Sequence, residues 1–117
     1  MRLLIVDDNQ RMRRFLLSLV SDLVTESWEA ENGLEAVEQY TRHHPDAVLM
    51  DIRMPFMDGL EATRKIVATD AGARVVIVTD FDNPAYRDQA RDAGAQNYLI
   101  KDKLFDLHGL LENLLPN

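Results

Sequence analysis

The sequence predicts an α/β domain in which a five-stranded parallel sheet is covered by helices on both faces. Two observations lead to this prediction: short apolar runs alternate with segments of helical periodicity, and the alternation repeats five times along the 117 residues. Parallel strands need crossover connections, which helices supply, so the pattern is typical of a doubly wound sheet. The length is that of one ordinary domain, and we expect a single domain over residues 1–117.

Four of the strands are expected as continuous apolar runs bounded by polar residues. Such runs are typical of strands that are buried on both faces of a sheet. They are Leu3–Val6, Ala47–Met50, Val75–Val78 and Tyr98–Ile100. A fifth strand is expected at residues 25–30, where Trp28 supplies most of the apolar surface. Its polarity suits the edge of the sheet.

The segments between the runs carry apolar side chains at helical spacing. The patterns are Met12, Phe15, Leu16, Leu19, Val20 and Leu23, then Leu34, Val37 and Tyr40, then Leu60, Thr63 and Val67, then Tyr86, Ala90 and Ala93, and finally Leu104, Leu107, Leu111 and Leu114. Capping residues predict three helix starts, at Asn32, Asp58 and Asn83. Gly72 and Gly94 stand where helices are expected to end.

The composition excludes several classes of protein. Hydrophobic residues make up 46% of the chain, enough for a packed core, and there is no cysteine for disulfides or thiolate sites. No apolar run approaches the roughly 18 residues of a membrane span, and the N-terminus does not resemble a secretory signal. We therefore expect a cytoplasmic protein that contacts no membrane. The net charge of −7 disfavours direct binding to nucleic acid.

Polar side chains follow four of the strands at the end where open parallel sheets bind ligands. Asp7 and Asp8 follow the first strand, and Asp51 follows the third. Thr79 and Lys101 follow the fourth and the fifth. If the strand order is 2-1-3-4-5, the first and third strands are neighbours. Three carboxylates then converge in one cleft beside a hydroxyl and an ammonium group.

Each of these residues alone also fits an ordinary structural role, such as a turn for the aspartate pair or a surface position for the lysine. Together they favour a cation site, because clustered carboxylates repel one another unless a cation lies between them. Oxygen ligands without His or Cys nearby favour a hard ion, most simply Mg²⁺, which also binds phosphate oxygens. The arrangement therefore predicts a magnesium site that receives a phosphoryl group.

Four motifs in order make the chain resemble, from end to end, the response regulator receiver domains of two-component signalling. They are LLIVDDN at 3–9, VLMDIRMP at 48–55 followed by Asp58–Gly59, VIVT at 76–79, and AGA at 93–95 leading to YLIK at 98–101. Within the family, the chain resembles the branch of transcriptional regulators with a LuxR/FixJ-type DNA-binding domain. The resemblance implies a flavodoxin-like (βα)5 fold with strand order 2-1-3-4-5. It also implies a phosphoacceptor switch rather than an enzyme with turnover.

The resemblance assigns the residues of the metal and phosphoryl sites. Asp51 matches the aspartate that receives the phosphoryl group from a sensor histidine kinase. Asp8 and Asp51 match side-chain ligands of Mg²⁺. Asp7 matches a residue that holds the ion largely through water, and Arg53 one that contributes its backbone carbonyl. Lys101 matches the lysine that pairs with Asp51 and then with a phosphoryl oxygen.

Two further residues match the switch of the family. Thr79 matches the hydroxyl that moves to bond the phosphoryl group, and Tyr98 the aromatic residue whose rotation reports that movement. Phosphorylation is then expected to alter the face formed by the fourth helix, the fifth strand and the fifth helix. A homodimer formed on phosphorylation is one expected consequence.

The chain departs from the family pattern beside the phosphorylation site. Asp80 stands where a small residue is usual, and Arg53 and Phe81 lie two positions after Asp51 and Thr79. We expect Asp80 and Phe81 to shield the phosphoryl group from water, which gives a phosphorylated state that lasts minutes or longer. The alternative is that Asp80 orients the hydrolytic water and shortens that state.

Three other groups of residues are assigned structural roles. They are solvated arginines (Arg11, Arg13 and Arg14), surface histidines (His43, His44 and His108) and core-filling methionines (Met50, Met54 and Met57).

Two rival functions keep the same fold. A Mg²⁺-dependent phosphatase would need a second acid two residues after its nucleophile, where this chain has Arg53. An FMN-binding module would need a Ser/Thr/Gly-rich phosphate loop after the first strand, where this chain has Asp7 and Asp8. The sequence closes on Pro116 and Asn117 after the last expected helix. We expect either a stand-alone receiver that acts by docking or the N-terminal part of a transcription factor.

Overall fold

The structure, a computed structural model, describes residues 1–114 and contains one five-stranded sheet. All neighbouring strands pair in parallel, in the order β2-β1-β3-β4-β5, which confirms the predicted topology. The strands are β1 (Arg2–Val6), β2 (Glu26–Ala30), β3 (Ala47–Met50), β4 (Val75–Thr79) and β5 (Asn97–Ile100).

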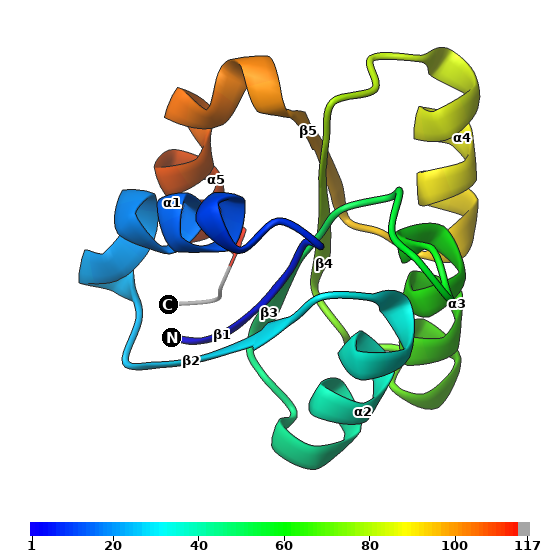
Figure 1. Ribbon diagram of the computed structural model, residues 1–117, viewed down its shortest axis with the longest axis horizontal. Coiled ribbons are helices and arrows are strands. Elements are labelled where there is room, and N and C mark those ends of the chain that lie inside the picture. Colours follow the sequence, from blue (N-terminus) through cyan, green and yellow to red (C-terminus); the bar gives the residue numbers. More distant parts are fainter. Residues whose placement is uncertain (115–117) are drawn as a thin grey trace.

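Helices cover both faces of the sheet, so the doubly wound architecture is also confirmed (Figure 1). Helices α1 and α5 lie on one face, and α2, α3 and α4 lie on the other. The helical elements are α1 (Gln10–Val20), η1 (Ser21–Leu23), α2 (Gly33–His43), α3 (Gly59–Thr69), α4 (Pro84–Ala93), η2 (Lys101–Asp106) and α5 (Leu107–Leu114). None of the helices within residues 1–114 has the length and apolar character that a membrane crossing requires.

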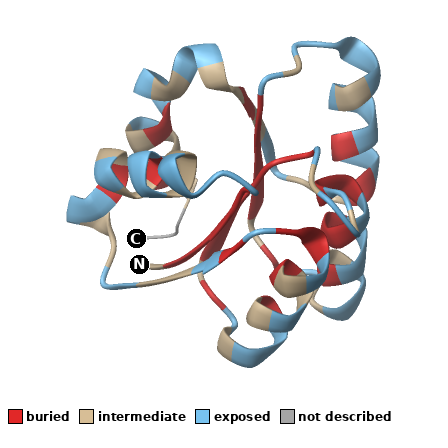
Figure 2. Ribbon diagram, viewed as in Figure 1, coloured by how far each residue is buried: buried red, intermediate tan, exposed pale blue. Residues whose placement is uncertain are grey.

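The core forms two layers because successive side chains of a strand point to opposite faces of the sheet. Leu3 and Ile5 pack in the layer under α1 and α5, whereas Leu4 and Val6 pack in the layer under α2, α3 and α4. Figure 2 shows buried residues concentrated in the strands and on the helix sides that face the sheet. The apolar runs of the sequence are thus strands buried on both faces, as expected.

The predicted helix starts are confirmed, with a side-chain cap at each. The Asn32 side chain accepts a hydrogen bond from the Glu35 N–H at 2.9 Å, and Asp58 accepts one from Glu61 at 2.8 Å. Asn83 caps α4, whose first residue is Pro84.

One predicted helix end is confirmed and one is wrong. Gly94 ends α4 with a φ of 104°, a conformation that glycine adopts without strain. Gly72 is not a cap, because α3 already ends at Thr69 with Asp70 as its cap. The Asp70 carboxylate accepts hydrogen bonds from the Tyr40 hydroxyl at 2.6 Å and from the Gly72 N–H at 3.0 Å. These two contacts stabilise a turn at Asp70, before the glycine is reached.

Four apolar positions differ from the helix predictions. Leu34 of α2 is 48% exposed, and Leu23 lies in the 3-10 segment η1 rather than in α1. Phe15 was expected on the buried face of α1, but it is 49% exposed. It directly precedes the buried Leu16 and therefore points about 100° away from it around the helix. Leu104 lies in the 3-10 segment η2 rather than in α5. The predicted closure of the last helix by Pro116 falls outside the described residues.

The residues with assigned structural roles are only partly as predicted. Arg13 is not a solvated residue: its side chain is 11% exposed, pairs with Glu29 at 2.7 Å and donates to the Asp7 carbonyl at 2.6 Å. His43 is half-buried, because its ring stacks on Trp28 with 4.2 Å between centroids. The methionine prediction is confirmed, since Met50 is buried and Met54 and Met57 pack against the core.

Candidate functional site

The sheet brings the ends of β1 and β3 side by side. Val6 and Met50, the last residues of these strands, are register partners, so Asp7 and Asp51 follow at adjacent positions. The Asp7 N–H donates to the Ala30 carbonyl at 3.1 Å, and the Asp51 N–H donates to the Val6 carbonyl at 3.0 Å. These backbone hydrogen bonds continue the strand pairing by one residue and fix the backbone positions from which both carboxylate side chains extend.

Three carboxylates meet at this edge of the sheet, as the sequence predicted. One oxygen from each of Asp7, Asp8 and Asp51 lies within 4.8 Å of the others. Asp7 is 1% exposed and Asp51 is 8% exposed, whereas Asp8 lies open to solvent. The cluster therefore has two buried members and one member that faces the entrance.

Lys101 joins the two buried carboxylates. Its Nζ donates to an Asp7 oxygen at 2.9 Å and to an Asp51 oxygen at 3.2 Å. Burial by itself lowers the pKa of Lys101, but the hydrogen bonds and charges of Asp7 and Asp51 outweigh it and raise the pKa above its ordinary value. The ammonium group is therefore charged at neutral pH.

The buried position of Asp51 disfavours its charged form. Burial is the main cause that raises the pKa of its carboxyl to about 6, and the charge of Asp7 adds to it. The Lys101 charge and the Ile52 N–H, which donates to Asp51 at 2.8 Å, act in the opposite direction and do not cancel the rise. One lysine thus does not neutralise this site, and a further cation would stabilise it.

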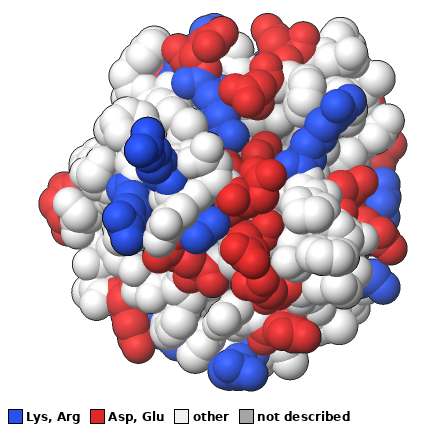
Figure 3. Space-filling view, in the orientation of Figure 1, with Lys and Arg blue, Asp and Glu red and all other residues white. Residues whose placement is uncertain are grey.

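The donor set fits Mg²⁺. It consists of carboxylate oxygens around a cavity of about 280 Å³, which leaves room for waters and a phosphoryl group beside the ion. The cavity is lined by Asp7, Asp8, Asn9, Met12, Asp51, Arg53, Asp80, Phe81 and Lys101. Figure 3 shows acidic side chains gathered in the middle of the face presented, with Lys and Arg side chains on either side.

Thr79 and Tyr98 both contact the backbone of Phe81, in the loop that leads from β4 to α4. The Thr79 hydroxyl is buried and accepts a hydrogen bond from the Phe81 N–H at 3.4 Å. The Tyr98 hydroxyl donates to the Phe81 carbonyl at 2.5 Å. The two residues expected to form the switch therefore meet at one loop residue.

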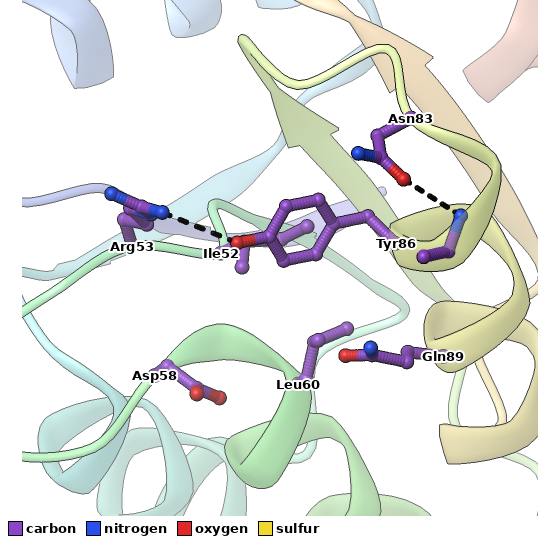
Figure 4. Close-up of a pocket in the computed structure, with 8 residues that line it drawn as sticks. Ile52, Arg53, Asp58, Leu60, Asn83, Tyr86 and Gln89 are labelled. Carbon is purple, nitrogen blue, oxygen red and sulfur yellow. Dashed lines mark hydrogen bonds between the residues drawn. The ribbon is translucent and has the colours of Figure 1, made fainter.

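The side chain of Arg53 extends toward α4. Its guanidinium lies 4.8 Å from the centre of the Phe81 ring and donates to the Tyr86 hydroxyl at 3.4 Å (Figure 4). A second cavity of about 340 Å³ lies on this side of Arg53, and Leu60 and Gln89 also line it. Arg53 thus stands between the carboxylate cleft and this second cavity.

Three residues of the site were not predicted. Asn9 lines the cleft, caps α1 by accepting from the Met12 N–H at 3.0 Å, and donates its own N–H to Asp7 at 2.9 Å. Its place directly after the aspartate pair and before a helix was a signal for this role. Met12 and Tyr86 reach the site from helices, and no local motif points to them.

Residues 3–113 match the family described as the response regulator receiver domain. The chain belongs to this family. It is 42% identical to the chemotaxis protein CheY of Halobacterium salinarum over 100 residues, which cover 86% of the chain and 83% of the relative.

Solved structures of receiver proteins have the same fold. A two-component response regulator of the LuxR family from Aurantimonas sp. SI85-9A1 superimposes with a TM-score of 0.88 at 32% identity, over 95% of this chain and 81% of the other. A DNA-binding response regulator of the LuxR family from Staphylococcus aureus gives a TM-score of 0.88 at 28% identity, over 97% of each chain.

Proposed function

We propose that the protein is a phosphoacceptor switch in which Asp51 receives a phosphoryl group from a sensor histidine kinase. The observation that carries the proposal is the contact of Lys101 with Asp51 and Asp7 beside the exposed carboxylate of Asp8. The geometry offers a nucleophilic oxygen, a fixed cation and an oxygen-rich site for a second cation in a cleft large enough for a phosphoryl group. Membership of the receiver family supports the same chemistry.

The reaction needs positioning more than acid–base chemistry. Phosphoryl transfer passes through a loose transition state, so catalysis consists mainly of in-line alignment and neutralisation of charge. An Asp51 oxygen attacks phosphorus, and the Lys101 ammonium, already hydrogen-bonded to that carboxylate, then binds a phosphoryl oxygen. Because the pKa of Asp51 is about 6, the carboxylate is ionised near pH 7.5 and needs no general base.

The metal site is proposed from the same residues. Asp8, Asp51 and the backbone carbonyl of Arg53 would hold Mg²⁺ directly, and Asp7 would hold it through water. When bound, Mg²⁺ offsets the negative charge of the phosphoryl oxygens. The Asp7 carboxylate accepts hydrogen bonds from Lys101 and from the Asn9 N–H, which fix its orientation beside the proposed ion site.

The conformational response is proposed to pass through the loop at Phe81. A Thr79 hydroxyl that turns toward the phosphoryl group gives up its hydrogen bond from Phe81, and the loop then moves relative to Tyr98. The face formed by α4, β5 and α5 would change as a result, and a homodimer formed through it is part of the proposal.

The process that the switch controls is proposed from the similar proteins. Similarity to LuxR-family regulators supports control of transcription through a DNA-binding domain. The 42% identity to a chemotaxis protein favours the second candidate, a receiver that acts by docking to another protein. Light scattering with Mg²⁺ and beryllofluoride separates the two, because dimerisation supports the transcriptional reading and a persistent monomer supports docking.

Transfer from a kinase tests the main proposal. A phosphorylated histidine kinase mixed with the protein should lose its label to the wild type and not to Asp51→Asn. The label on the protein should approach one phosphoryl group per chain and then decay. Added phosphate esters should not be hydrolysed continuously. Continuous release of phosphate from such esters would favour the phosphatase instead. The variant Asp102→Asn removes an exposed carboxylate at another place and should accept label like the wild type.

A further inference from the structure

Asp80 is a fourth carboxylate in the phosphoacceptor cleft. It directly follows Thr79 at the end of β4, is exposed, and lines the same cavity as Asp7, Asp8 and Asp51. Within residues 1–114 it forms no ion pair. Its charge therefore acts on whatever enters the cleft.

The two cations of the cleft do not neutralise Asp80. Lys101 is engaged with Asp7 and Asp51. The guanidinium of Arg53 is directed toward the Phe81 ring and the Tyr86 hydroxyl, on the side of α4. Four carboxylates thus line the cavity against two cationic side chains, and Asp80 is exposed without a cationic partner among residues 1–114.

We propose that Asp80 sets the phosphodonor specificity of the cleft, favouring donors whose phosphoryl group is bonded to a protonated nitrogen over dianionic acyl phosphates. This inference rests on the proposed function, because it presupposes transfer to Asp51. In-line attack places the leaving group on the side of phosphorus opposite Asp51, within the cavity that the exposed Asp80 also lines. The protonated nitrogen of the donor is attracted by that carboxylate, whereas the carboxylate group that leaves from an acyl phosphate is repelled.

Transfer from an N-phosphoryl donor and transfer from an acyl phosphate differ in the charge of the group that leaves. With an N-phosphoryl donor, the P–N bond breaks and the nitrogen keeps the electron pair and its proton, so a neutral base leaves. With an acyl phosphate, the P–O bond breaks and a carboxylate anion leaves. In each case the new bond joins phosphorus to an Asp51 oxygen. The discrimination therefore comes from the charge of the donor and not from a different product.

The test compares two small donors, phosphoramidate and acetyl phosphate, on the wild type, Asp80→Asn and Asp80→Ala. Asn removes the charge and keeps the bulk, and Ala removes both. Asp82→Asn is the matched control, because Asp82 is exposed on the same loop but does not line the cleft. Initial rates of Asp51 phosphorylation are measured with Mg²⁺ at low and high ionic strength.

We expect Asp80→Asn to raise the rate with acetyl phosphate about three- to tenfold and to lower the rate with phosphoramidate by up to about twofold, with both changes shrinking in high salt. Asp82→Asn should leave the ratio of the two rates at the wild-type value. An unchanged ratio in Asp80→Asn overturns the inference. A change confined to Asp80→Ala also overturns it, because bulk would then be the cause. If neither donor modifies Asp51 in any variant, the proposed function itself fails.

Discussion

Removing the charge of Asp51 should stabilise the metal-free protein. The Asp51 side chain is 11% exposed, and burial is the main cause of its pKa of about 6. A rise from 3.8 to about 6 corresponds to about 3 kcal/mol at about 1.4 kcal/mol per pKa unit. Asn has the size of Asp and resembles the protonated carboxyl, so Asp51→Asn should approach this gain at pH 8.

The stability of Asp51→Asn relative to the wild type should increase as the pH rises from 4 to 8. The folded state binds the Asp51 proton more tightly than the unfolded state, so the contribution of this group to stability is full below pH 4 and is lost as pH rises to about 6. The wild type should therefore lose up to about 3 kcal/mol relative to Asp51→Asn between pH 4 and pH 8. The variant lacks the titrating group, and the difference between the two proteins isolates its effect.

Urea unfolding with EDTA at several pH values between 4 and 8 measures this difference. Asp102→Asn, which removes an exposed carboxylate, should follow the wild type at every pH. Added Mg²⁺ should raise the stability of the wild type and narrow the gap, because the ion binds the folded carboxylates. A difference that stays flat with pH, or a less stable Asp51→Asn at pH 8, would refute the reasoning.

Three further predictions concern lifetime, the switch and the backbone around Asp51. The phosphorylated state should last minutes or longer, and Asp80→Ala should shorten it. Loss of the phosphoryl group within seconds in the wild type would contradict this. Slower decay in Asp80→Ala would show that the carboxylate assists attack by water. Beryllofluoride with Mg²⁺ should shift the amide NMR signals of Tyr98 and α4, whereas shifts confined to the Asp51 loop count against the proposed switch. Gly59→Ala should destabilise by about 1–3 kcal/mol or more in urea unfolding, because a Cβ there would lie 1.7 Å from the Asp51 carbonyl oxygen. Gly109→Ala, whose Cβ meets nothing within 4 Å, should instead be neutral or stabilising, and equal effects at the two glycines would refute the packing argument.

The strands and the acidic residues that follow them could be predicted from local patterns, and the strand order that brings these residues together was implied by the resemblance to receiver domains. Apolar runs mark the buried strands, and the topology then places the residues after β1 and β3 at one edge of the sheet. Asp7, Asp8 and Asp51 follow those strands directly, so their approach required no knowledge of side-chain conformations.

Contacts between distant segments could not be predicted in this way. Arg13 is held by Glu29 and by the Asp7 carbonyl, and neither partner is signalled by the spacing along α1. The orientation of Arg53 toward Tyr86 depends on how α4 packs beside the loop after β3. Asp70 ends α3 before Gly72 because its carboxylate binds the Tyr40 hydroxyl of another helix. Each case needs the tertiary structure, which periodicity alone does not supply.

Mapping the modified residue tests the central proposal most directly. The wild type is incubated with Mg²⁺ and phosphoramidate, reduced with borohydride, and digested for mass spectrometry. An aspartyl phosphate is converted to homoserine by this treatment, so we expect homoserine at position 51 alone, and none without Mg²⁺ or in Asp51→Asn. Homoserine at another aspartate, or phosphoryl uptake by Asp51→Asn at the wild-type rate, would contradict it.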